Sequence, residues 1–146
     1  MIKTFRGQLA DGEQETIRLS TVRGQIGYRI VKFQLMCVQP GLGNQESIAQ
    51  LFTNEQATVP TSAGIVDFDN SELLAAAIFT ASTNQKTDPE DLAVIFDHVK
   101  FNQDIYITHT DNEGALPINY YLELEQTKLD INEATVATLK DMRGTN

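Results

Sequence analysis

Strict alternation of apolar and polar residues is the feature of this sequence that most restricts its fold. In residues 28–38, Val31, Phe33, Leu35 and Cys37 alternate with polar or less apolar neighbours. A two-residue period places successive side chains on opposite faces of an extended chain. We therefore expect a half-buried β-strand here, with these four residues on its inner face and Cys37 as a small buried hydrophobe.

A second alternating segment lies near the C-terminus. Tyr120, Leu122 and Leu124 occupy every second position, and Tyr121 begins the complementary polar set. The adjacent tyrosines must point to opposite faces of a strand. We expect the ring of Tyr120 or Tyr121 to lie in the core and the other ring to be partly covered.

Further short segments have the composition of strands and are separated by turn residues such as Asp11-Gly12. The complete set of predicted strands is 5–9, 16–19, 28–38, 47–52, 65–68, 92–96, 99–101, 105–110 and 118–126. Many short antiparallel strands with such breaks are typical of sandwiches and barrels. We therefore predict a mainly β fold, a single-domain antiparallel sandwich or jelly-roll-like barrel spanning residues 1–146.

Two helices are expected to interrupt the strands. Asp69 to Glu72 resembles a capping box and precedes the apolar run 73–79, which predicts a short buried internal helix. A similar start at Asp130, with a glycine cap at Gly144, predicts a C-terminal helix. Its apolar stripe comprises Ile131, Thr135, Leu139 and Met142.

The composition restricts the functional classes. The chain has 146 residues, 41% of them hydrophobic, and a net charge of −9, which argues against nucleic-acid binding because phosphate contacts need clustered cations. A single cysteine excludes an internal disulfide. The start of the chain does not resemble a signal peptide, and the longest apolar run is too short to span a bilayer. We expect a soluble protein made in the cytoplasm.

Candidate chemical sites are few. His98 and His109 lie eleven residues apart without a clear third metal ligand, although Asp97, Asp104 and Asp111 are near in sequence. Residues 111–114 read as a hairpin turn rather than a calcium loop, and Asp67 and Asp69 read as turn or cap residues. No phosphate loop or nucleophile elbow is present. We predict no enzyme activity, no cofactor and no metal, and an enzyme centred on His98 or His109 remains the alternative.

Features compatible with assembly are easier to find. Thr, Gln and Asn make up close to a quarter of the residues, and such side chains suit polar interfaces. Residues 1–40 carry six basic and three acidic residues, whereas residues 41–146 carry five basic and seventeen acidic residues, which favours head-to-tail attraction between copies. The candidate partner-binding residues are Arg18, Arg23, Arg29, Lys32, Leu139 and Met142.

Residues 26–33, 102–109 and 135–143 resemble small virion structural proteins of tailed bacteriophages, and the similarity runs from about residue 16 to the C-terminus. The resemblance implies a capsid decoration or cement protein, assembled in the host cytoplasm and located in the virion. It also implies a homo-oligomer that binds the major capsid protein or other virion proteins, without catalytic residues. A head–tail connector or tail component, and a β-sandwich binding module for carbohydrate or a receptor, are the alternatives.

Overall fold

The computed structural model describes residues 1–19, 25–57, 65–81, 92–96 and 98–129, and every regular element among them is a β-strand. The eight strands are β1 (Ile2–Leu9), β2 (Gln14–Ile17), β3 (Ile26–Cys37), β4 (Gln45–Phe52), β5 (Leu73–Ala81), β6 (Leu92–Phe96), β7 (Ile105–Asp111) and β8 (Ile118–Lys128). They form two antiparallel sheets, with strand orders β1-β8-β3 and β2-β7-β4-β5-β6. The predicted mainly β, antiparallel fold is confirmed.

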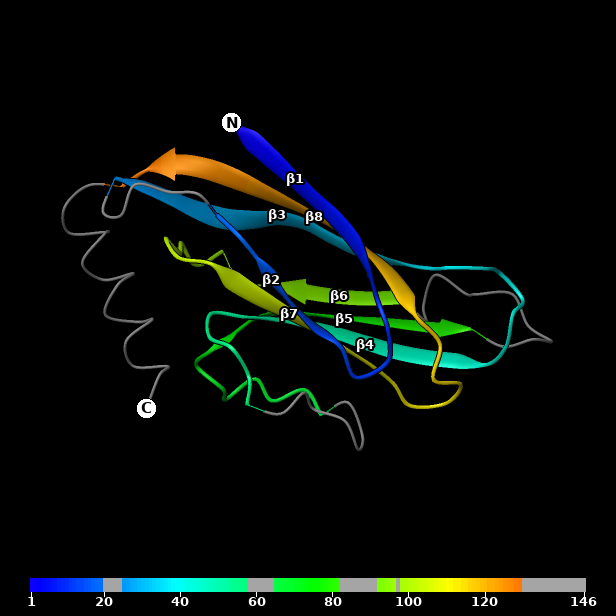
Figure 1. Ribbon diagram of the computed structural model, residues 1–146. Coiled ribbons are helices and arrows are strands. Elements are labelled where there is room, and N and C mark those ends of the chain that lie inside the picture. The colour runs from blue at the N-terminus through cyan, green and yellow to red at the C-terminus, as the bar shows by residue number, and fades with distance from the viewer. Residues whose placement is uncertain (20–24, 58–64, 82–91, 97, 130–146) are drawn as a thin grey trace.

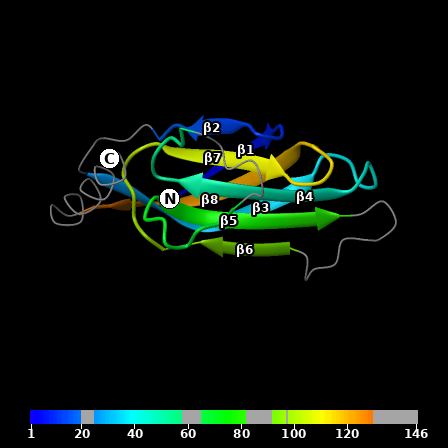
Figure 2. The ribbon, with the colours of Figure 1, turned by 90° about the horizontal axis from the view of Figure 1, so that it is seen from below.

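The two sheets face each other as the layers of a sandwich-like fold. The three-stranded sheet lies above the five-stranded sheet in Figure 1, and the view from below in Figure 2 looks onto the outer face of the five-stranded sheet. Within the described residues neither sheet is closed, so each has two edge strands: β1 and β3 in the smaller sheet, β2 and β6 in the larger.

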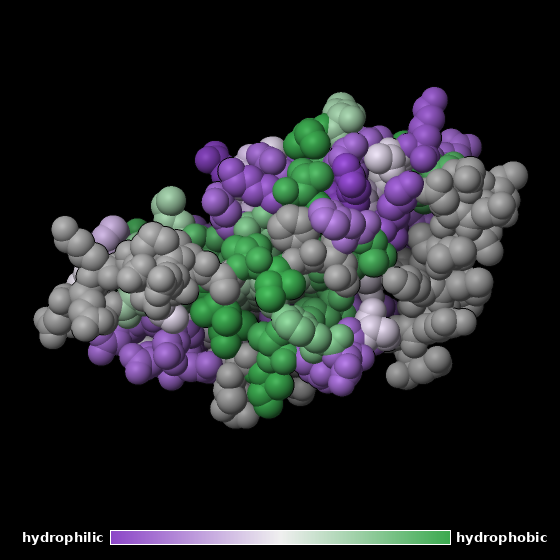
Figure 3. Space-filling view, turned by 180° about the vertical axis from the view of Figure 1, so that it is seen from behind, coloured by the Kyte–Doolittle hydropathy of each residue, from purple (hydrophilic) through white to green (hydrophobic). Residues whose placement is uncertain are grey.

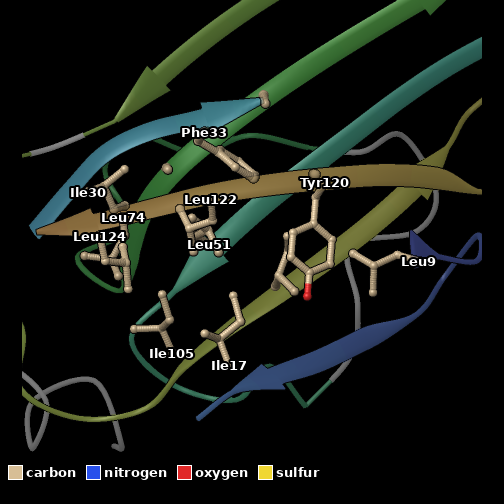
Figure 4. Close-up of a cluster of buried hydrophobic side chains, with 14 of the residues drawn as sticks. Leu9, Ile17, Ile30, Phe33, Leu51, Leu74, Ile105, Tyr120, Leu122 and Leu124 are labelled. Carbon is tan, nitrogen blue, oxygen red and sulfur yellow. The ribbon is translucent and has the colours of Figure 1, made fainter. Parts of the chain in front are cut away.

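The hydrophobic core fills the space between the sheets. Figure 4 shows side chains from both layers meeting there, including Leu122 and Leu124 of β8 opposite Leu51 of β4. Fully burying one such aliphatic side chain contributes about 1.5–3 kcal/mol. The alternation of β8 is confirmed: Tyr120 is buried with the two leucines, and Tyr121 is only partly covered on the outer face.

A β-bulge in β3 changes the predicted alternation. The register with β8 shifts between Ile30 and Lys32, so Ile30 and Phe33 are both buried although they lie three residues apart. The bulge inserts one extra residue, which reverses the inward and outward positions on either side of it. Val31 therefore does not share the buried face of Phe33, and Cys37 is half-buried against the core rather than fully enclosed.

The predicted internal helix over residues 73–79 is wrong, because this segment is strand β5. β5 pairs with β4 on one side and with β6 on the other, and Leu74 to Ala77 are buried in succession. A strand covered on both faces reads as a continuous apolar run and lacks the alternation that identifies a half-buried strand. The residues expected to cap the helix form turns instead: Asp67 accepts from the Asp69 N–H and Asn70 from the Glu72 N–H, both at 2.9 Å.

Two predicted strands are also absent from the described residues. The segment 65–68 has no strand pairing and leads into the turn before β5, and residues 99–101 contribute only a single bridge between Phe101 and Tyr28. The chain before β5 lies against the outer face of the larger sheet, where Gln50 Nε2 donates to the Ile65 carbonyl at 3.0 Å. The predicted C-terminal helix lies outside the described residues.

Candidate functional site

A hydrogen-bonded histidine and serine lie on the core-facing side of the larger sheet, on the neighbouring strands β7 and β4. His109 Nε2 is 2.9 Å from Ser47 Oγ, and His109 Nδ1 is 3.1 Å from the Ala10 carbonyl oxygen. Because a carbonyl only accepts, Nδ1 carries the proton and Nε2 accepts from the Ser47 hydroxyl. Ser47 Oγ in turn accepts from Gln45 Nε2 at 2.8 Å. The chain of donors and acceptors is complete.

The environment of this pair favours a structural role. Both side chains are fully buried, and His109 is oriented by a backbone carbonyl rather than by a carboxylate. Burial lowers the pKa of His109 below its usual 6.5, an effect that the Ala10 carbonyl and the charges of Asp11 and Asp111 partly offset. The histidine is therefore neutral at pH 7, and the enclosed Ser47 hydroxyl offers a substrate no access.

Asp111 organises the loop that joins β7 to β8. Its Oδ1 accepts from the Glu46 and Glu113 N–H groups at 2.9 and 3.0 Å, and its Oδ2 accepts from the Leu116 N–H at 2.7 Å. Burial alone would raise the pKa of Asp111, but these backbone donors outweigh it and the pKa lies below its usual value. The predicted hairpin turn over residues 111–114 is wrong: β7 and β8 belong to different sheets, and the loop that Asp111 holds passes from one sheet to the other.

Within the described residues, the histidines and aspartates are not brought together into a metal site, and Asp97 lies outside those residues. The described residues contain no group of three or more His, Cys, Asp or Glu side chains placed to hold a metal ion. His98 is exposed after β6, whereas His109 is buried within β7. Asp104 accepts from the Leu19 N–H at 2.7 Å, and Asp67 caps an exposed turn.

Three of the candidate partner-binding residues fall within the described residues. Arg18 is exposed after β2. Arg29 forms an ion pair with Glu125 at 2.6 Å, and Lys32 Nζ lies 5.7 Å from the ring centroid of Tyr121. Both therefore belong to the outer face of the three-stranded sheet. The remaining candidates, Arg23, Leu139 and Met142, lie outside the described residues.

The same outer face is hollowed by a groove of about 870 Å³ that crosses β1, β8 and β3. The outward side chains that line it are Arg6, Gln8, Gln34, Met36, Asn119 and Tyr121, and Gly7, Leu35 and Tyr120 complete the lining. We call this the three-strand groove. No feature of the sequence indicated this groove, because its residues are far apart in the chain and meet only through the strand order β1-β8-β3. The alternating positions alone carried no signal of that order.

A second exposed surface lies at the free edge of the larger sheet. Figure 3, the view from behind, shows hydrophobic residues gathered in the middle of the molecule. The exposed apolar residues of β5 and β6 are Ile78, Val94 and Ile95. We call these residues the β6 edge, because β6 pairs with β5 on one side only among the described residues. Val94 is opposite the core residue Ala77, so it lies on the other face of the sheet from Ile78 and Ile95.

Comparison with protein-family models, with curated proteins and with solved structures finds no match to this chain. Among the described residues there is no helix of the length and hydrophobicity needed to cross a membrane.

Proposed function

We propose that this chain is a non-enzymatic virion structural protein, most simply a capsid decoration or cement protein that binds the outer surface or the joints of a phage shell. The resemblance in residues 26–33, 102–109 and 135–143 supports the virion assignment. The observation that carries a structural role is the β6 edge, where an uncharged apolar strand pairs on one side only within the part of the chain that the structure describes.

The order in which the strands pair supports a jelly-roll arrangement, one of the β architectures expected from the sequence. β1 pairs with β8, β2 with β7 and β4 with β5, so the pairs are nested about the middle of the chain. β3 contacts β6 across the sandwich, although β6 hydrogen-bonds to β5. Jelly rolls wrap in this nested manner and occur in viral capsid and lectin domains. The fold does not itself determine function, so the proposal rests on the exposed surfaces.

The four sheet edges differ in how they oppose pairing with another chain. β1 carries Lys3 and Arg6, β2 carries Glu15, and β3 carries charged residues and the bulge at Val31. Charges and bulges of this kind block association of sheet edges. β6 has the sequence Leu-Ala-Val-Ile-Phe, without charge, proline or bulge, and its Val94 and Ile95 are exposed.

A second copy of the chain is the partner that fits the β6 edge best. Antiparallel pairing of two β6 strands about a two-fold axis would place Val94 opposite Val94, so the same surface serves both copies. Pairing would satisfy the backbone groups along the outer side of β6 and reduce the exposure of Val94 and Ile95. The net charge of −9 favours a place outside a DNA-filled shell, where neutralising phosphates is not required.

The test is the molar mass of purified protein by size-exclusion chromatography with light scattering, for wild type and for Ile95→Lys. Ile2→Lys is a matched control, because Ile2 is also an exposed isoleucine on an edge strand, 50% exposed against 54% for Ile95. We expect a dimer or larger closed assembly that Ile95→Lys dissociates and Ile2→Lys preserves.

The outcomes separate the structural roles. A discrete ring would favour the head–tail connector or tail alternative over decoration. A wild-type monomer at every concentration would contradict self-assembly through the β6 edge. Thermal unfolding of both variants shows whether each remains folded, so that a loss of mass is attributable to the interface.

A further inference from the structure

We infer that the three-strand groove is a binding site for a carboxylate-bearing oligosaccharide. The register of the smaller sheet aligns the outward residues of its strands in adjacent rows. One row contains Arg6, Tyr121 and Gln34, and the next contains Gln8, Asn119 and Met36. The groove volume, about 870 Å³, lies within the range of about 300–1,000 Å³ that is usual for small-molecule sites.

The charge of the groove favours an anion. Arg6 is its charged residue, and none of the described residues that line it is acidic. The Arg6 side chain has no ion pair or hydrogen bond within the described residues, whereas the nearby Arg29 is held by Glu125. Glu123 lies beside the groove, where it accepts from the Tyr121 hydroxyl and is opposite Lys32 in the strand register, so the unpaired Arg6 guanidinium is the charge within the lining itself. A guanidinium matches a carboxylate with two parallel hydrogen bonds.

The amides of the groove favour a polyhydroxylated ligand. Gln8 Nε2 donates to Asn119 Oδ1 at 3.2 Å, which orients both side chains and leaves the Gln8 carbonyl oxygen for a ligand. The amide of Gln34 has no protein partner within the described residues, so its donor and its acceptor are both available. An amide offers a donor and an acceptor close together, which suits neighbouring hydroxyls of a sugar ring.

Apolar surface accompanies these polar groups. The Tyr121 hydroxyl donates to Glu123 Oε1 at 2.7 Å, which fixes the ring, and Met36 is 68% exposed at the opposite strand. A fixed tyrosine ring contributes apolar contact area at little entropic cost. The combination of one cation, oriented amides and a tyrosine matches the acid, hydroxyl and C–H groups of an acidic sugar.

The experiment titrates ¹⁵N-labelled full-length protein with tri-galacturonate and with sialyllactose and follows its NMR spectrum. The neutral counterparts are methyl-esterified tri-galacturonate and lactose, and sodium acetate tests for binding of the carboxylate alone. We expect at least one acidic sugar to shift the side-chain amide signals of Gln8, Gln34 and Asn119 at millimolar concentration. Its neutral counterpart should bind about tenfold more weakly, because one charge-assisted contact is lost.

Two matched variants complete the test. Arg6→Gln should weaken binding of the acidic sugar about tenfold and abolish its preference over the neutral counterpart. Arg18→Gln removes an exposed arginine outside the groove and should leave binding unchanged. The inference is overturned if neither acidic sugar binds, if acetate produces the same shifts at the same concentration, or if Arg6→Gln binds as well as wild type. Because the groove and the β6 edge belong to different sheets, Ile95→Lys should retain sugar binding, so the two proposals fail independently.

Discussion

Ser47 Oγ and His109 Nε2 lie 2.9 Å apart on adjacent strands, and both side chains are completely buried. The distance is that of a nucleophile and its general base, but the surroundings differ from those of a catalytic pair. The other ring nitrogen, Nδ1, donates to the Ala10 carbonyl, and the Ser47 oxygen accepts a hydrogen bond from Gln45. The pair belongs to a hydrogen-bonded polar network on the core-facing side of the larger sheet, and we expect changes in it to alter the stability of the fold.

The first prediction concerns pH. Burial lowers the pKa of His109 in the folded protein, so the unfolded chain binds more protons below its pKa of 6.5. The stabilisation is complete above pH 6.5 and is lost as the pH falls through the lower, folded-state pKa. Urea unfolding between about pH 5 and pH 8 should show a free energy of unfolding that declines toward acid.

The variant His109→Gln separates this effect from other titrations. It should be less stable than wild type at neutral pH by about 1–3 kcal/mol, because buried partners lose their hydrogen bonds. Its stability should depend less on pH in the same window. His98→Gln, at an exposed position, is the control and should retain the wild-type dependence. An unchanged dependence in His109→Gln would contradict the assignment.

The second prediction concerns the loop after β7. Asp111 accepts hydrogen bonds from three backbone N–H groups, so Asp111→Ala should lower the free energy of unfolding by about 1–3 kcal/mol. Asp111→Asn should cost less, because its one remaining oxygen still accepts. Because the pKa of Asp111 is lowered in the folded protein, this side chain also makes the free energy of unfolding depend on pH in acid. Its stabilisation is complete above pH 3.8 and is lost as the pH falls through the pKa of the folded state.

The control for this loop is Asp67→Ala, which removes a single hydrogen bond in an exposed turn. Chemical unfolding should show a change below about 1 kcal/mol for this variant. Equal costs for Asp67→Ala and Asp111→Ala would indicate that the Asp111 hydrogen bonds do not stabilise the loop.

The third prediction concerns a close approach between two strands of the smaller sheet. A methyl group added at Gly7 would lie 2.9 Å from the ring and hydroxyl of Tyr120, which is buried and bonded to Glu15. Because the ring cannot move freely, Gly7→Ala should destabilise the protein by about 1–3 kcal/mol. Gly43→Ala meets Leu116 at an ordinary 3.6 Å and is the control. Thermal unfolding that ranks the two variants equally would contradict this account.

How much of this fold follows from the sequence depends on how each strand is buried. β8 shows its alternation openly because only one of its faces is buried, so Leu122 and Leu124 identify the core directly. β5 is buried on both faces over Leu74–Ala77, and its apolar run after a cap-like segment is equally typical of a helix. The bulge at Val31 was also invisible, because one inserted residue leaves the local composition of β3 unchanged.

The candidate surfaces were harder to predict than the strands. Each residue of the three-strand groove occupies an ordinary polar position, and only the pairing of Arg6 with Tyr121, and of Tyr121 with Gln34, brings them together. Such pairings join segments about a hundred residues apart, which local periodicity does not specify. The β6 edge had a local signal in its uncharged composition, but its position at a sheet edge depended on strand order.

The last prediction distinguishes two forces that could hold copies together. Attraction between the basic first forty residues and the acidic remainder would weaken as salt screens it. Within one protomer, however, Arg29 is already paired with Glu125 and Lys32 lies over Tyr121, so part of this basic charge is engaged.

Copies of net charge −9 repel each other, and salt reduces that repulsion while leaving apolar contacts at the β6 edge intact. Light scattering from about 0.05 to 0.5 M NaCl should therefore show association that strengthens with salt. Association that weakens instead would favour head-to-tail pairing through Arg18 and the other basic residues over pairing of β6 strands.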